Sequence, residues 1–237
     1  MKWIFLLATF LISGFAHANK DLYGAWKMET PEGETVTMII NEGYLVVAQY
    51  NLPGKVFGYT EGGVIRLNGK SLVYDCEFNS DDASQVGTKT NWEFSISGNR
   101  LTLVGNRGTF EFQRVDRASD HAMAGTWHIT ERAQDGVGAL VKIHQTGTRK
   151  TLKVLSGTRF QWIAIDPGAK GFYGTGGGTY KAENGKYIEK IEFFSRDNSR
   201  VGASLEFNWK LSNGRWDHSG KSSKGDPIHE VWEKIPR

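Results

Sequence analysis

Three ionisable side chains in the C-terminal half of the chain, Glu189, His218 and Glu230, are the ones whose types and spacing could do chemistry together. Glu189 alternates with Tyr187 and Ile191, so a strand of period two would place its carboxyl group on an apolar face. A carboxylate buried there must pair, titrate or contact a ligand. A buried Glu near a His can also act as a general base.

A metal site and a structural role are the alternatives for these residues. One His with two carboxylates resembles the facial arrangement of non-haem iron, but that arrangement usually needs two His. His229 is adjacent to Glu230 in the chain and should therefore face the other side of the strand, so we expect no metal and no cofactor. In the structural reading, Glu189 pairs with Arg159 or Lys190, and His218 caps a turn beside Asp217. No Ser-x-x-Lys, Gly-x-Ser-x-Gly or His-Glu-x-x-His motif identifies an enzyme class.

The elements that must position these side chains belong to a duplicated chain. Gly24-Ala25-Trp26 returns as Gly125-Thr126-Trp127, and the segment 77–87 returns as 192–202 with its Glu-Phe and Val-Gly landmarks. A repeat of about a hundred residues has the size of a domain. We therefore predict a first domain at 19–117, a linker at 118–122 and a second domain at 123–237.

Both halves have the pattern of antiparallel strands. Apolar and polar residues alternate through 92–97 and 204–211, which predicts strands with one face toward a core. Asn68-Gly69, Asn184-Gly185 and Asn213-Gly214 favour the tight turns of hairpins. The sequence predicts an all-β protein made of two antiparallel β-barrel domains in tandem.

A Gly-x-Trp near the start of each unit, followed by successive hairpins and a late basic residue, resembles the lipocalin-like (calycin) superfamily. Arg114 matches the late Arg in the first domain, and Lys234 takes that place in the second. The segments 177–193 and 216–233 are also similar to exported bacterial lipocalin-like domains of unknown function. The resemblance implies small barrels whose interior can hold one compact ligand, with Trp26 and Trp127 packing across the closed end.

Alignment of the two repeats indicates how their interiors differ. Glu189, His218 and Glu230 correspond to Tyr74, Leu103 and approximately Phe110, so only the second interior carries ionisable groups. We expect the first barrel to be filled and structural, and the second to hold the ligand. Its walls would be the aromatic residues of the second domain, Phe160, Trp162, Tyr180 and Trp216.

Two segments of the second domain are expected to depart from the first. The run 152–162 reads as two additional strand segments around Ser156-Gly157. The glycines between Gly171 and Gly178 are expected to form a flexible rim, and no helix follows them to support phosphate binding. Arg149, Lys150 and Lys153 form the densest basic patch, which we interpret as a solvated strand edge.

The N-terminal segment and the composition indicate the cellular compartment of the protein and the partners it can have. Residues 1–18 carry Lys2, an apolar stretch and Ala16-His17-Ala18, the pattern of a secretory signal peptide, so we expect an exported protein, periplasmic or secreted. The apolar stretch is too short to span a bilayer, and no integral membrane segment is expected. Cys76 is the only cysteine, so no intramolecular disulfide forms, and we expect a buried thiol. A formal net charge of +3 with scattered Lys and Arg argues against nucleic-acid binding.

These observations favour an exported binding protein over an enzyme. The ligand would be a small apolar, aromatic or sugar molecule held between the aromatic walls and the anchors Glu189, His218 and Glu230. One alternative is an acid–base enzyme, an isomerase or hydrolase, that uses Glu189 and His218. Another is an envelope interaction module with both barrels filled. The sequence leaves the ligand, the catalytic residues, the oligomeric state and the relative orientation of the domains open.

Overall fold

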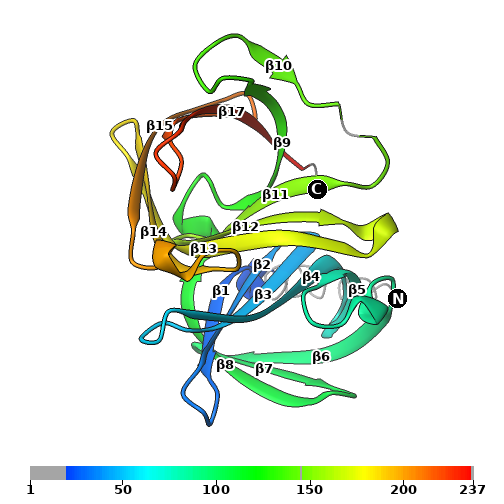
Figure 1. Cartoon of the computed structure of the whole chain (residues 1–237). Coiled ribbons are helices and arrows are strands. Elements are labelled where there is room, and N and C mark those ends of the chain that lie inside the picture. The colour runs from blue at the N-terminus through cyan, green and yellow to red at the C-terminus, as the bar shows by residue number, and fades with distance from the viewer. Residues whose placement is uncertain (1–19, 145, 236–237) are drawn as a thin grey trace, which may run out of the picture.

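The computed structural model describes residues 20–144 and 146–235 of the 237-residue chain. The predicted signal peptide at 1–18 lies outside these residues. The described part is all-β, as predicted, and forms two closed antiparallel barrels in tandem (Figure 1). Among these residues, no helix has the length and apolarity needed to cross a membrane.

The first barrel is an up-and-down sheet in which each strand pairs with the next and β1 pairs with β8 to close it. Its strands are β1 (Gly24–Glu29), β2 (Thr35–Asn41), β3 (Tyr44–Asn51), β4 (Val56–Asn68), β5 (Ser71–Asn79), β6 (Lys89–Ser97), β7 (Arg100–Gly105) and β8 (Gly108–Arg117). Short 3-10 helices follow β5, η1 (Ala83–Gln85), and β8, η2 (Ala118–Asp120).

The second barrel repeats this order, and the pairing of β9 with β17 closes it. Its elements are β9 (Gly125–Ala133), β10 (Leu140–Lys142), β11 (Lys150–Leu155), β12 (Arg159–Asp166), η3 (Pro167–Ala169), β13 (Gly171–Glu183), β14 (Lys186–Phe194), η4 (Asn198–Arg200), β15 (Ser204–Ser212), β16 (Arg215–Lys221) and β17 (Pro227–Lys234). The hairpins β13–β14 and β15–β16 turn at Asn184-Gly185 and Asn213-Gly214, where all four residues have positive φ. That backbone matches the strand twist of a two-residue hairpin.

Strand register aligns the two barrels residue by residue. Trp26 lies opposite Met38, and Trp127 lies opposite Lys153, so β11 corresponds to β2. The run 152–162 is therefore β11 and the start of β12, not additional strands. The extra residues of the second barrel are β10 and the segments beside it, because β9 pairs with both β10 and β11 along one edge.

The glycines predicted to form a rim lie instead within β13, which pairs along its length with β12 and β14. Gly176 lies opposite Trp162, and a Cβ at this glycine would come within 2.7 Å of the indole nitrogen. The glycine therefore makes room for the ring.

The barrels pack against each other through corresponding faces, β2–β5 against β11–β14 (Figure 1). Phe78 stacks on Phe172 with ring centroids 6.3 Å apart, and Phe57 stacks on Phe193 at the same distance. Phe78 occupies the strand position of Phe193, and Phe57 that of Phe172, so the two stacks are related by an approximate two-fold axis. An interface of this kind has the self-complementarity of a symmetric dimer, here within one chain.

Candidate functional site

The interior of the second barrel contains an ion pair that the sequence analysis missed. Lys153 on β11 and Glu189 on β14 are both buried, and the Lys153 Nζ lies 2.8 Å from the Glu189 Oε1. The ammonium group also lies 5.0–5.8 Å from the ring centroids of four aromatic side chains: Tyr187, Phe207, Trp216 and Trp232. The rings and the carboxylate together replace the water that the ammonium group has lost.

This arrangement corrects two interpretations from the sequence. Lys153 is not part of a solvated strand edge, because both faces of β11 are covered: Leu152 and Val154 pack between the barrels, and Lys153 points inward. Glu189 pairs with neither Arg159 nor Lys190. Arg159 instead forms an ion pair with Glu192 and donates a 2.9 Å hydrogen bond to the Tyr50 hydroxyl in the interface between the barrels.

His218 and Glu230 lie directly opposite each other on β16 and β17. The His218 Nδ1 is 3.6 Å from the Glu230 Oε2, and the Trp232 indole donates a 3.2 Å hydrogen bond to the same oxygen. Burial, followed by the charge of Lys153, lowers the pKa of His218 below its ordinary value. Neither His218 nitrogen makes a hydrogen bond of normal geometry to another described residue, so Glu230, 3.6 Å away, is its nearest charged partner.

The predicted aromatic walls surround the same interior. Phe160, Tyr180 and Trp216 are buried in one cluster, and Trp162 packs at its edge with its ring 5.5 Å from that of Phe194. The Tyr180 hydroxyl donates a 2.8 Å hydrogen bond to the Ser156 carbonyl. The structure thus brings all the predicted anchors and walls to the second barrel, where Lys153 occupies its centre. Their role in ligand binding stays a prediction.

The first barrel, which the sequence analysis expected to be filled, holds a cavity of about 300 Å³. Its lining is mostly apolar and comes from all around the barrel: Met28, Val36, Met38, Leu45, Val47, Leu72, Trp92, Leu103, Phe110 and Phe112, with Thr30, Gln49, Tyr59, Glu61, Tyr74 and Arg107 as the polar members. The expectation of a filled first barrel is therefore wrong.

Side-chain volume explains the cavity. At four corresponding inward positions the first barrel has Met38, Leu45, Val47 and Leu72 where the second has Lys153, Phe160, Trp162 and Tyr187. The second barrel therefore has larger side chains, three of them aromatic, at positions that line the cavity of the first. Comparison of the ionisable positions alone could not show this difference, whereas comparison of residue sizes at every inward position would have.

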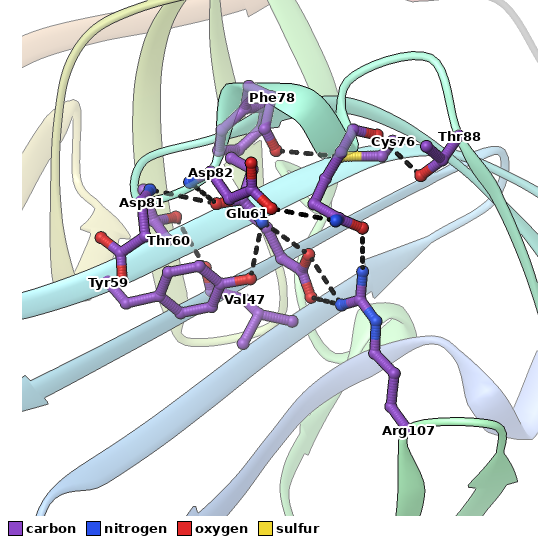
Figure 2. Close-up of polar contacts among 12 residues, drawn as sticks. Val47, Tyr59, Thr60, Glu61, Cys76, Phe78, Asp81, Asp82, Thr88 and Arg107 are labelled. Carbon is purple, nitrogen blue, oxygen red and sulfur yellow. Dashed lines mark hydrogen bonds and ion pairs between the residues drawn. The ribbon is translucent and has the colours of Figure 1, made fainter.

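One end of the cavity is polar (Figure 2). Glu61 on β4 accepts hydrogen bonds from Arg107 Nη1 at 3.2 Å and from the Asn79 side chain at 3.3 Å. Arg107, in the turn between β7 and β8, donates a second bond of 3.0 Å to Gln85. Asn79 also donates to the Tyr59 hydroxyl at 3.2 Å. The Arg107 side chain is 34% exposed and the Glu61 side chain 14%, so this ion pair lies where the cavity meets solvent.

Tyr74 and Cys76 lie on β5 beside this polar end. The buried thiol of Cys76 interacts with the Phe78 carbonyl at 3.4 Å, and burial raises its pKa above the ordinary value (Figure 2). A thiol in this state is a poor nucleophile, as expected from the sequence. Among the described residues, no group of three or more His, Cys, Asp or Glu side chains is placed to hold a metal ion.

The second barrel corresponds poorly to the first at this end. Tyr59 and Glu61 occupy the strand positions of Gly174 and Gly176. The first barrel thus combines an apolar interior with a polar opening, and the second combines a charged interior with glycines at the equivalent positions.

Searches with protein-family models and against curated proteins found no match to this sequence.

Proposed function

We propose that this protein binds one small, largely apolar molecule inside its first barrel. The observation that carries the proposal is the cavity of about 300 Å³ enclosed by apolar strands and opening at a polar end. Ligand sites of proteins have this character, an apolar pocket with a few polar groups that fix orientation. The cavity lies in the first barrel, so the binding site proposed here differs from the one that the sequence predicts in the second barrel.

The size and lining of the cavity narrow the ligand class. An apolar cavity of about 150 Å³ holds benzene, so this one suits a two-ring aromatic molecule or a short aliphatic chain. A sugar would bury several hydroxyl groups against Leu, Val and Phe side chains that offer no hydrogen bonds, and this is costly. Apolar and aromatic ligands are therefore favoured over sugars.

The experiment fills the cavity with a side chain that the second barrel already accommodates. Val47→Trp copies Trp162, the residue at the corresponding position, and places an indole in the cavity. We expect the purified protein to bind the neutral dye N-phenyl-1-naphthylamine at one site with enhanced emission. Val47→Trp should weaken that binding about tenfold or more, because a hydrophobic pocket discriminates even a single methylene.

Two further variants serve as controls, one on the outer surface of the first barrel and one inside the second barrel. Val104→Trp makes the same addition on the outer face of β7, where the residue is 47% exposed, and should bind the dye like the unmodified protein. Trp162→Val tests the second barrel. Loss of dye binding in Trp162→Val but not in Val47→Trp would return the site to the second barrel and contradict the proposal.

A further inference from the structure

The cavity of the first barrel contains a hydroxyl group without a strong hydrogen-bond partner. Tyr74 on β5 is 4% exposed and lines the cavity, and its hydroxyl makes no hydrogen bond of normal geometry to any other described residue, its one polar neighbour of that kind being the Cys76 thiol, a weak partner. A buried polar group left unsatisfied is costly, and native proteins rarely keep one without a function. The group is placed to donate a hydrogen bond to something inside the cavity.

The neighbours of Tyr74 determine which chemical group of a ligand its hydroxyl can bind. Burial, and next the charge of Glu61, raise the pKa of Tyr74 above its ordinary value, so the hydroxyl stays protonated and available as a donor. Glu61 also gives this end of the cavity a carboxylate, which disfavours a second anion. Arg107 is the cation of this end, and it already donates to Glu61 and Gln85. A neutral acceptor is therefore the group that fits.

We infer that Tyr74 selects ligands that carry a neutral carbonyl oxygen at one end of an apolar body, over hydrocarbons and carboxylates of the same shape. The inference rests on the proposed function and adds the ligand's chemical class. In the bound state the Tyr74 hydroxyl donates to the carbonyl oxygen, and the apolar body lies among Leu72, Leu103 and Phe112. The hydroxyl that is unsatisfied in the empty barrel then gains its partner.

The test uses three two-ring probes of matched shape: 2-acetylnaphthalene, 2-ethylnaphthalene and 2-naphthoate. Their affinities for the purified protein and for Tyr74→Phe are measured by calorimetry or by displacement of the dye. We expect Tyr74→Phe to lower the ratio of ketone affinity to hydrocarbon affinity about tenfold, because the carbonyl loses its donor while the naphthalene contacts stay. The carboxylate should bind the unmodified protein more weakly than the ketone does.

The matched control is Tyr187→Phe in the second barrel. Tyr187 is also fully buried, with its hydroxyl beside Glu189, and it does not line the cavity, so its removal should leave the affinity ratio unchanged. Tyr74→Phe should unfold at about the temperature of the unmodified protein or above it, since its hydroxyl gives up only the weak interaction with the Cys76 thiol. A lower unfolding temperature for Tyr74→Phe would reveal an internal partner of the hydroxyl and overturn the inference.

The outcomes separate the two proposals. If ketone and hydrocarbon both bind and Tyr74→Phe leaves their ratio unchanged, the inference fails and the proposed function stands. The inference also fails, and the proposed function stands, if 2-naphthoate binds more tightly than the ketone, because a cation would then recognise the ligand instead of the Tyr74 hydroxyl. If neither neutral naphthalene binds, the proposed function and the inference fail together.

Discussion

The two barrels share strand order, register and the packing of a tryptophan at one end, yet their interiors are stabilised in different ways. The second contains a buried cluster of aromatic rings around the ion pair of Lys153 and Glu189, and the first encloses an apolar cavity beside Tyr74. The two repeats thus differ in that one has a charged, ring-lined interior and the other an apolar interior with a cavity. The charged residues that first suggest a function are therefore candidates for a structural role, and the open space lies among ordinary apolar residues.

The largest effect is expected from breaking the buried ion pair of the second barrel. Glu189→Gln removes the carboxylate that is paired with the Lys153 ammonium group and leaves the aromatic rings and the more distant Glu230 around it. Loss of one partner of a buried pair costs about 3–5 kcal/mol, so the free energy of unfolding should fall by that amount in urea titrations. The double variant Lys153→Met/Glu189→Leu replaces the ion pair with two apolar side chains, of which the Met copies Met38, the residue that corresponds to Lys153 in the first barrel.

The double variant should recover most of the loss and unfold within about 1 kcal/mol of the unmodified protein, since apolar replacement of a buried pair is often neutral or stabilising. This result would show that the pair fills space in the second barrel. A double variant as unstable as Glu189→Gln would contradict that interpretation. Retained stability in Glu189→Gln itself would contradict the burial of the pair.

The next effect is a pH dependence that only the second barrel should contribute. His218 is buried with Lys153, Glu189 and Glu230 as its charged neighbours, and its pKa is lowered from 6.5 mainly by burial. The unfolded chain therefore binds a proton at His218 at a pH where the folded chain does not. Stability from this group is fully present above about pH 6.5 and is lost as the pH falls below it, with a slope of at most about 1.4 kcal/mol per pH unit.

His218→Leu copies Leu103, the corresponding residue of the first barrel, and should remove this slope. The measurement is the free energy of unfolding between about pH 7 and pH 5 for both proteins. Their difference reports His218 together with its effect on Glu230, whose pKa His218 lowers against the effect of burial, while the other carboxylates are common to both proteins. A variant with the same slope as the unmodified protein would show that His218 does not cause it.

Most of the fold could be predicted from the sequence because alternation and Asn-Gly turns are local signals. The burial of Glu189 and His218 could also be predicted, since Glu189 alternates with Tyr187 and Ile191 and His218 shares a strand face with Trp216. Lys153 was not, because a strand covered on both faces gives no alternation from which exposure can be judged. The cavity depends on the summed volumes of residues from every strand of the first barrel, and no single position shows it.

The smallest expected effect concerns the cation that lies beside the buried tryptophan of each barrel. The Arg114 guanidinium lies 4.0 Å from the Trp26 ring centroid, and its three nitrogens are buried with no hydrogen bond to another described residue. In the second barrel, the Lys234 Nζ is 5.5 Å from Trp127 and also donates a 2.6 Å hydrogen bond to the Ala124 carbonyl. Stacking of a planar cation on the indole is therefore a larger part of what holds Arg114.

Arg114→Lys should consequently lower the free energy of unfolding by about 0.5–1 kcal/mol, because an ammonium group cannot stack and is more strongly hydrated. Arg100→Lys, the same change on an exposed side chain of the first barrel, should stay within about 0.5 kcal/mol of the unmodified protein. The two variants are compared by urea unfolding under identical conditions. Equal losses would mean that the stacked geometry adds nothing beyond a positive charge, and the two barrel ends would then be energetically alike despite their different cations.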